Sequence, residues 1–203
     1  MRHQFYADSR DAMKWSIMYR LTGKFRGIFW VVTLRPDKAG ESTYGNTKHR
    51  VDEAEAFIEG FLSSERGKPK DLRRTGKMFE PVGVRFHAHL DDYPNDPKGQ
   101  GEYWRSVLWH LKERHEDQRD VVFLDPDNGI AGKKCAGEHV SIEHIAWVWE
   151  ALRPKDVLAV YQHSFRETDW AEKKQKVISA ALGCDVAAHG RGVVRFFIKE
   201  KAH

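Results

Sequence analysis

Cysteine is scarce in this sequence and long apolar runs are missing, and each absence excludes a class of protein. Only two cysteines, Cys135 and Cys184, stand among 203 residues. That is too few for a disulfide-stapled secreted domain, and no further thiol lies near either one to complete a zinc site. No stretch approaches the roughly 18 apolar residues of a transmembrane helix, and residues 1–20 carry charges where a signal peptide is apolar. We therefore expect a reduced, cytoplasmic protein that does not enter a membrane.

A large excess of charge of one sign is also missing. The chain has 34 basic and 30 acidic residues, a formal net charge of +4 and an isoelectric point near 9.0. This modest field permits RNA or DNA as a partner without requiring one. Basic residues are concentrated between positions 66 and 74, within a possible inserted loop at 66–80. Such a segment is either a solvated loop or an arm that contacts phosphates.

The hydrophobic pattern indicates a single domain spanning residues 1–203. An apolar content of 40% and an aromatic content of 12% are enough for one core. Helical spacing of apolar residues predicts helices at 9–23, 51–66, 99–116, 142–152 and 168–182. In the first of these, Met13, Ile17 and Leu21 form the apolar face. Apolar or alternating runs predict strands at 27–34, 81–90, 120–125, 157–161, 184–188 and 193–199.

The alternation of these helices and strands predicts the fold class. Strands that are apolar throughout, such as 27–34 and 157–161, belong to parallel sheets covered by helices on both faces. The last two predicted strands are joined by His189-Gly190-Arg191-Gly192, which is typical of a hairpin. We therefore expect an α/β fold with a three-layer, Rossmann-like arrangement, in which a mostly parallel sheet ends in a C-terminal antiparallel hairpin.

Polar residues directly follow two of the buried strands. Asp125 ends one strand ahead of Pro126-Asp127-Asn128-Gly129, and Tyr161-Gln162-His163 ends the next. Ligands of open α/β sheets bind outside the carboxyl ends of the strands, because loops and helix N-termini converge there. We therefore expect a polar site at this edge. The alternative is that Asp-Pro-Asp-Asn-Gly is a turn whose side chains cap local amides, and that His163 is an ordinary hydrogen-bonded histidine.

Two further segments carry groups that suit a nucleoside or a nucleic acid. Near the N-terminus, Phe5, Tyr6 and Lys14 combine aromatic rings with an ammonium group, which can stack on a base and hold a phosphate. The alternative is a solvated arm before a capped helix. The loop 35–46, after the first strand, is either flexible or a cradle for a nucleoside-bearing cofactor. Its candidate contacts are Gly40, Tyr44, Gly45 and Asn46.

The N-terminal residues resemble those of a known family. Arg2-His3-Gln4-Phe5 followed by Asp11-Ala12-Met13-Lys14 is similar to the start of the large-subunit ribosomal RNA adenine-N6 methyltransferases, which are class I S-adenosylmethionine-dependent enzymes. Asp125-Pro126-Asp127-Asn128 stands where that family carries an Asp-Pro-Pro-aromatic motif at a strand end. The terminal hairpin also resembles the closing antiparallel strand of the class I enzymes. The resemblance covers these short segments and the order of the elements.

The resemblance implies a methyltransferase-like enzyme that uses S-adenosylmethionine and acts on nucleic acid. In that family the N-terminal segment shapes the adenine pocket and the strand-end Asp grips the exocyclic amine. The candidate catalytic residues are Asp125, Asp127, His163 and Lys14. The candidate cofactor-binding residues are Gly40, Tyr44, Gly45 and Asn46, and the candidate substrate-binding residues are Phe5, Tyr6, Asn128, Tyr161 and Gln162.

Two other functions fit the same residues. Asp125, Asp127 and His163 could converge on Mg²⁺ or Mn²⁺ in a metal-dependent nuclease or phosphoesterase, since carboxylates suit these ions and the ions activate water. This hypothesis gives the second Asp a role. A noncatalytic relative that binds nucleic acid or a protein through its basic loop and N-terminal arm is the third possibility, because a fold does not guarantee chemistry.

Overall fold

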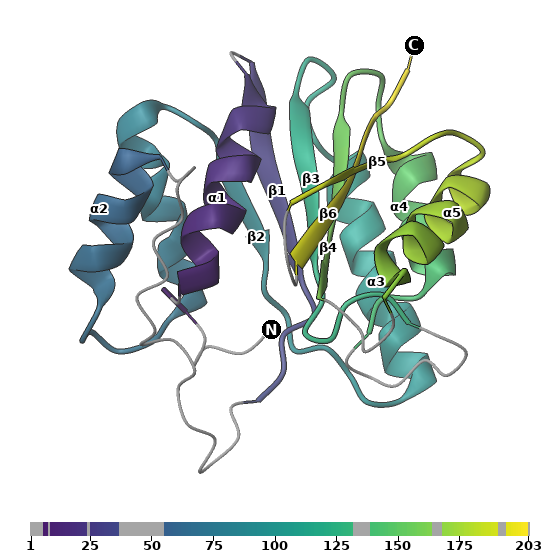
Figure 1. The fold of residues 1–203 in the computed structure, drawn as a ribbon, viewed down its shortest axis with the longest axis horizontal. Coiled ribbons are helices and arrows are strands. Elements are labelled where there is room, and N and C mark those ends of the chain that lie inside the picture. The colour runs from purple at the N-terminus through teal and green to yellow at the C-terminus, as the bar shows by residue number, and fades with distance from the viewer. Residues whose placement is uncertain are drawn as a thin grey trace.

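Helices and strands alternate along the chain in a computed structural model that describes residues 6–7, 9–23, 25–36, 55–131, 139–163, 168–190 and 194–202. The helices are α1 (Ser9–Thr22), α2 (Ala56–Glu65), α3 (Pro97–Lys112), α4 (Ile142–Ala151) and α5 (Trp170–Leu182). The strands are β1 (Arg26–Val32), β2 (Phe86–His89), β3 (Arg119–Asp125), β4 (Val157–His163), β5 (Ala187–His189) and β6 (Val194–Glu200), as Figure 1 shows. None of the helices in these ranges combines the length and the apolar character needed to cross a membrane.

The six strands form one mixed sheet in the order β2-β1-β3-β4-β6-β5. β2, β1, β3 and β4 are parallel, whereas β6 runs antiparallel to both of its neighbours, β4 and β5. The predicted α/β class, with a mostly parallel sheet and an antiparallel C-terminal end, is confirmed. The last strand does not form the edge of the sheet, because β6 inserts between β4 and β5.

Successive strand residues enter two separate cores, one on each face of the sheet. On one face, Ile28, Trp30 and Phe123 pack in the same cluster as residues of α1 and α2. On the other face, Phe29 and Val122 pack in the same cluster as residues of α3, α4 and α5. Figure 1 shows these two groups of helices on opposite sides of the sheet. Both faces of β1, β3 and β4 are therefore buried, which explains their continuous apolar sequences.

The predicted apolar face of α1 packs against the core, but another face is more deeply buried. Met13, Ile17 and Leu21 are partly buried against the core. The face turned to the sheet carries Trp15 and Met18 together with Asp11 and Lys14, and each of the four is at most 3% exposed. The prediction followed the apolar spacing, and two charged side chains interrupt that spacing on the face that is most deeply buried.

The basic stretch after α2 is solvated in its first part and anchored to the core further on. Residues 66–69 are exposed, whereas Leu72 and the later Phe79 are at most 1% exposed. They belong to a segment that contains two 3-10 helices, η2 (Leu72–Met78) and η3 (Glu80–Val82). The buried carboxylate of Glu65 lies 2.8 Å from both Lys68 Nζ and Arg74 Nε. Burial alone would raise the pKa of Glu65, but its hydrogen bonds and these cations lower it. Two of the basic side chains therefore neutralise a buried acid.

The predicted strand at 81–90 is shorter in the structure and forms β2 over Phe86–His89 only. The preceding residues are helical, and Gly83 ends η3 with a φ of 68° in the left-handed region. The expectation that this strand lies at the sheet edge is confirmed, because β2 pairs with β1 alone.

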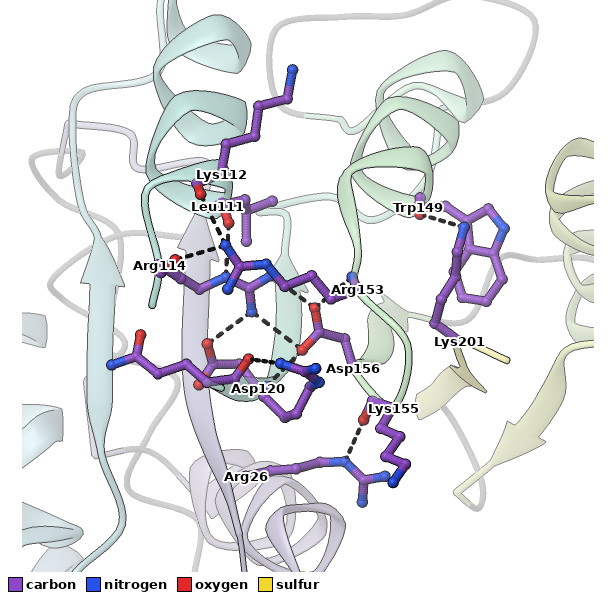
Figure 2. A network of polar contacts seen from close by, with 12 residues as sticks. Arg26, Leu111, Lys112, Arg114, Asp120, Trp149, Arg153, Lys155, Asp156 and Lys201 are labelled. Carbon is purple, nitrogen blue, oxygen red and sulfur yellow. Dashed lines mark hydrogen bonds and ion pairs between the residues drawn. The ribbon is translucent and has the colours of Figure 1, made fainter. Parts of the chain in front are cut away.

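A buried charge network joins the amino ends of β3 and β4 (Figure 2). Arg114 Nη1 lies 2.8 Å from Asp120 Oδ2, and its Nη2 lies 2.7 Å from Asp156 Oδ2. Asp156 also accepts hydrogen bonds from the backbone N–H groups of Asp120 and Arg153, at 2.8 and 2.9 Å. Burial alone would lower the pKa of Arg114, but the bonds to the two carboxylates outweigh it and raise that pKa. The network fastens the start of β3 to the start of β4.

Replacing Asp156 with Asn should lower the free energy of unfolding by about 3 kcal/mol, because it leaves the buried guanidinium of Arg114 with one carboxylate instead of two. Urea denaturation of both proteins measures the difference. Glu172→Gln is the matched control, since it breaks an exposed ion pair with Lys176 and should leave the unfolding midpoint unchanged. Equal midpoints for Asp156→Asn and the wild type would contradict the assigned role.

Candidate functional site

The carboxyl ends of β1, β3 and β4 lie side by side, as predicted. Val32 of β1 is paired with Asp125 of β3, and Leu124 is paired with Val160 of β4. β3 therefore ends at Asp125 beside Tyr161, and β4 ends at His163 on the same edge of the sheet. The prediction that Asp125 and His163 share one edge is confirmed at the level of the strands that carry them.

The carboxylate of Asp125 is buried and half-satisfied. Its Oδ2 accepts hydrogen bonds from Lys14 Nζ at 2.9 Å and from Trp30 Nε1 at 3.2 Å. The residue is 1% exposed. Its Oδ1 is also buried but has no hydrogen-bond partner within the described part of the chain. One oxygen is therefore fixed by the protein, whereas the other is held inside with an acceptor site left open.

Lys14 connects this carboxylate to two other groups. Its Nζ lies 3.5 Å from Asp11 Oδ1 and 4.8 Å from the centre of the Tyr161 ring. Asp11 Oδ2 in turn accepts a hydrogen bond from the backbone N–H of Ala7 at 2.8 Å. The Lys14 ammonium therefore lies between two buried carboxylates, those of Asp11 and Asp125.

Tyr161 extends the cluster toward His163. The Tyr161 hydroxyl lies 3.3 Å from His163 Nδ1, and the two rings meet edge to face with centroids 4.6 Å apart. Tyr161 is buried, whereas His163 is partly exposed. The structure thus brings together four predicted site residues, Lys14, Asp125, Tyr161 and His163, on the face of the sheet that α1 covers.

Gln162 lies on the opposite face and serves the backbone. Its Oε1 accepts a hydrogen bond from the N–H of Ile130 at 2.6 Å, and its Nε2 donates to the carbonyl of His163 at 2.7 Å. The side chain is completely buried. Both halves of its amide therefore have protein partners, and the bond to Ile130 holds the loop after β3.

The remaining predicted residues are more dispersed. Asn128 is exposed, and Asp127 is half-buried with its backbone N–H bonded to Thr33 Oγ1 at 3.1 Å. The hydroxyl of Tyr6 donates to Glu65 at 3.1 Å, and burial together with this carboxylate raises the pKa of Tyr6. Phe5, Gly40, Tyr44, Gly45 and Asn46 lie outside the described residues.

Four residues near this edge were missed by the sequence prediction. Trp30 and Asp11 complete the surroundings of Asp125 and Lys14. A Trp in the middle of a buried strand requires an acceptor for its indole N–H, and this requirement was the available signal. Asp91 and Asp92 follow β2, and Asp92 forms a parallel bridge with Leu34 just after β1. They were missed because only the polar residues that follow two wholly apolar strands were considered, although the strand predicted over 81–90 ends directly before Asp91.

A metal centre was the alternative use of Asp125, Asp127 and His163. Among the described residues, no three His, Cys, Asp or Glu side chains are grouped closely enough to hold a metal ion. In addition, the ammonium of Lys14 already lies 2.9 Å from the Asp125 carboxylate. A divalent cation at Asp125 would therefore compete with a buried positive charge.

Gly129 shapes the loop after Asp125, and its replacement by Ala should be destabilising by about 2 kcal/mol. Its φ is +78°, and an added Cβ would lie 2.3 Å from Gln162 Nε2. Thermal melting measures the effect. Gly101→Ala in α3 is the control, because a Cβ there meets nothing within 4 Å, and Ala in a helix should raise stability by about 0.5–1 kcal/mol. If both variants melt like the wild type, the contact between Gly129 and Gln162 is not structural.

Comparisons with known proteins give no match to this chain, whether against family models, curated proteins or solved structures. The resemblance of the N-terminal and strand-end segments to the ribosomal RNA adenine-N6 methyltransferases therefore stays a prediction. The chemistry of the Asp125 site itself has to indicate the function, because a fold supports many activities.

Proposed function

We propose that this chain is an S-adenosylmethionine-dependent methyltransferase that acts on an amine nitrogen of a nucleic acid base. The observation that carries the proposal is the buried Oδ1 of Asp125, which has no partner in the described part of the chain. A buried acceptor left unsatisfied costs about 1–3 kcal/mol, and more when it is charged. An amine N–H that bonds to Oδ1 removes this cost at the moment of binding.

The protein fixes Asp125 in advance for such an amine. Lys14 and Trp30 both hold Oδ2, so the carboxylate need not rearrange when a ligand approaches Oδ1. Asp11 stands 3.5 Å behind Lys14 and gives the ammonium a second counter-ion. An electrostatic group that is positioned before reaction lowers the barrier more than one that must reorganise.

When bound, S-adenosylmethionine supplies a methyl group that an amine nitrogen can attack. Asp125 accepts a hydrogen bond from the amine, which aims the nitrogen lone pair and stabilises the positive charge that develops on the nitrogen. If the methyl carbon passed from the sulfonium sulfur to the nitrogen, S-adenosylhomocysteine would leave and the methylated amine would lose a proton, for which Oδ1 of Asp125 is the proposed acceptor. Lys14 keeps the carboxylate oriented throughout and does not itself contact the amine.

The end of β2 suits the nucleoside part of the cofactor. Tyr93 donates its backbone N–H to the carbonyl of Leu34 at 2.9 Å, and Asp92 is bridged to the same residue. Asp91 and Asp92 therefore lie beside the end of β1, where an acidic residue binds ribose hydroxyls in Rossmann-type folds. We extend the proposal to that fold, because helices cover both faces of a mostly parallel sheet.

A nucleic acid base is the substrate that agrees with the other features. The similarity of the N-terminal segment to the adenine-N6 enzymes and the slight basic excess both support it. A base can reach a carboxylate that is 1% exposed only if it leaves the stack, so the substrate should be single-stranded or flipped out of a helix.

Isothermal titration calorimetry should detect binding of S-adenosylmethionine and no comparable binding of Mg²⁺ or Mn²⁺. Asp92→Asn should weaken cofactor binding about tenfold, because it removes a charge-assisted hydrogen bond to the ribose. Asp117→Asn, in the exposed turn before β3 at the opposite edge, is the control and should bind like the wild type. Metal binding without cofactor binding would support the phosphoesterase hypothesis instead, and binding of neither would support a noncatalytic protein.

Asp125→Asn should reduce methyl transfer to single-stranded RNA about a hundredfold or more, because the developing positive charge loses its carboxylate. Cofactor affinity should change little. The variant leaves Lys14 without its nearest counter-ion, so circular dichroism must first show that it is folded at the assay temperature.

Asp127→Asn is the matched comparison for Asp125→Asn. In the amine mechanism, Asp125 alone accepts the hydrogen bond from the amine, so the loss of the Asp127 charge should cost much less activity. Equal losses for the two variants, together with metal-dependent activity, would contradict the amine mechanism and favour a metal held by both carboxylates.

A further inference from the structure

The edge strand β2 depends on side-chain contacts to stay attached. Among the strands that the structure describes, it pairs with β1 alone, over the four residues Phe86–His89. Phe86 faces the α1 side, where its ring contacts Phe79 and Trp15 with centroids 5.3 and 5.9 Å away. The other face of the strand presents His87 and His89. A short strand with one hydrogen-bonded neighbour opens locally at lower cost than a central strand.

Three imidazole rings form the contact between β2 and α3. The ring of His110, from α3, lies 5.7 Å from that of His87 and 5.4 Å from that of His89. His87 also stacks on Phe29 of β1 at 4.7 Å, and His89 meets Tyr103 of α3 edge to face at 4.8 Å. We define these three residues, His87, His89 and His110, as the histidine cluster. Aliphatic side chains in the same contact would carry no charge at any pH, whereas these three rings can be protonated.

The hydrogen bonds of the histidine cluster show where a second proton would go. His110 Nδ1 lies 2.9 Å from the carbonyl oxygen of Ser106, and because a carbonyl only accepts, this nitrogen already carries a proton and a second one would go to Nε2. His89 Nε2 is buried without a hydrogen-bond partner within the described residues. His89 is buried, His110 is half-buried and His87 is exposed, so a second proton on His110 and on either of the other rings would place like charges on rings whose centroids are 5.4 or 5.7 Å apart, with His89 and His110 only partly reached by water.

The surrounding charges do not compensate for protonation. Asp91 Oδ2 lies 3.5 Å from His89 Nε2, but its side chain is 72% exposed, so water screens the pair. Asp120 faces His87 from the start of β3, but its carboxylate is already bound by Arg114 at 2.8 Å and approached by Arg85 at 3.5 Å. The other groups that face the cluster are two neutral phenols, Tyr103 and Tyr93. Burial raises the pKa of Tyr103, and the neighbouring Tyr93 raises it further.

These surroundings set the direction of the pH dependence. Burial, followed by the neighbouring His110, lowers the pKa of His87 from its ordinary value of 6.5, and Asp120 opposes the shift only in part. Burial also lowers the pKa of His89, with Asp91 opposing and the other two histidines adding to the shift. Because the folded-state pKa values lie below the unfolded ones, the contact contributes its full stability above pH 6.5 and loses it as the pH falls.

We propose that the histidine cluster is an acid-sensitive latch that holds β2 on the sheet when neutral and releases it when protonated. Release would carry away Asp91, Asp92 and Tyr93, which follow β2 directly. The latch itself is independent of the proposed function. Its consequence, loss of the acidic residues beside β1 and hence of cofactor binding in acid, rests on that proposed function.

Hydrogen exchange followed by mass spectrometry tests the latch on the full chain without any ligand. Between about pH 7.5 and about pH 5, after correction for the intrinsic rate, peptides covering residues 84–93 should lose protection about fivefold or more. Peptides covering β3 and β4 should keep theirs. If β2 stays protected, or if all strands lose protection together, the latch is wrong.

Two substitutions of His110 make the test specific. His110→Phe keeps a ring in the contact but cannot be protonated, so β2 should stay protected in acid. His110→Lys places a permanent charge there, so β2 should already be exposed at neutral pH while β3 stays protected. His115→Gln, an exposed histidine outside the cluster, is the control and should behave like the wild type. An unchanged pH response in His110→Phe would overturn the proposal even if His110→Lys does not fold.

Calorimetry with S-adenosylmethionine on the same proteins separates the two proposals. Selective, pH-dependent opening of β2 without cofactor binding at neutral pH would retain the latch and remove the methyltransferase assignment. Cofactor binding at neutral pH, together with a protection of β2 that does not change with pH, would retain the methyltransferase assignment and remove the latch.

Discussion

The carboxylate of Asp156 sets the register on which the site at the opposite edge depends. Each of its two oxygens accepts one hydrogen bond from the guanidinium of Arg114 and one from a backbone N–H group. The N–H of Asp120 donates to Oδ1, and that of Arg153 donates to Oδ2. From this point β3 and β4 run parallel in one register, with Val121 paired with Val157 and Leu124 paired with Val160. A strand rises about 3.3 Å per residue and alternates its faces, so a slip of one residue would turn Asp125 away from α1. The geometry at the carboxyl ends is therefore fixed at the amino ends.

The two buried charge clusters differ in how completely the protein provides hydrogen-bond partners for their carboxylates. At the amino ends, Asp156 is fully satisfied by the protein. At the carboxyl ends, Asp125 has two donors on one oxygen and no partner on the other within the described residues. A buried ion pair is a poor source of stability even when it is complete, since desolvation offsets the attraction. An incomplete one is harder to explain by folding alone, whereas a ligand that donates a hydrogen bond to Asp125 explains it directly.

Sequence alone predicted the elements whose pattern follows from burial and missed those shaped by polar contacts. β1, β3 and β4 are apolar throughout because both faces are covered, and this also placed Asp125 and His163 at one edge. The apolar pattern of α1 did not identify its most deeply buried face, because Asp11 and Lys14 occupy that face, and a hydrophobic pattern cannot show that charged groups find partners inside. The strand predicted over residues 81–85 was wrong, because a short run of alternating apolar residues also suits a 3-10 helix such as η3.

The triplet Tyr161-Gln162-His163 shows how far strand periodicity can organise a site. Alternate side chains point to opposite faces, so Tyr161 and His163 join Lys14 on the α1 side while Gln162 reaches across to the loop after β3. The same three residues thus line the Asp125 site and hold the turn that follows Asp125. The carboxylate of Asp125 lies on the face that α1 covers, because its Oδ2 bonds to Lys14 and Trp30 and the Lys14 ammonium lies over the Tyr161 ring. The two faces of one strand end therefore have different partners, since the α1 side carries the charged cluster and the other side holds the loop after β3.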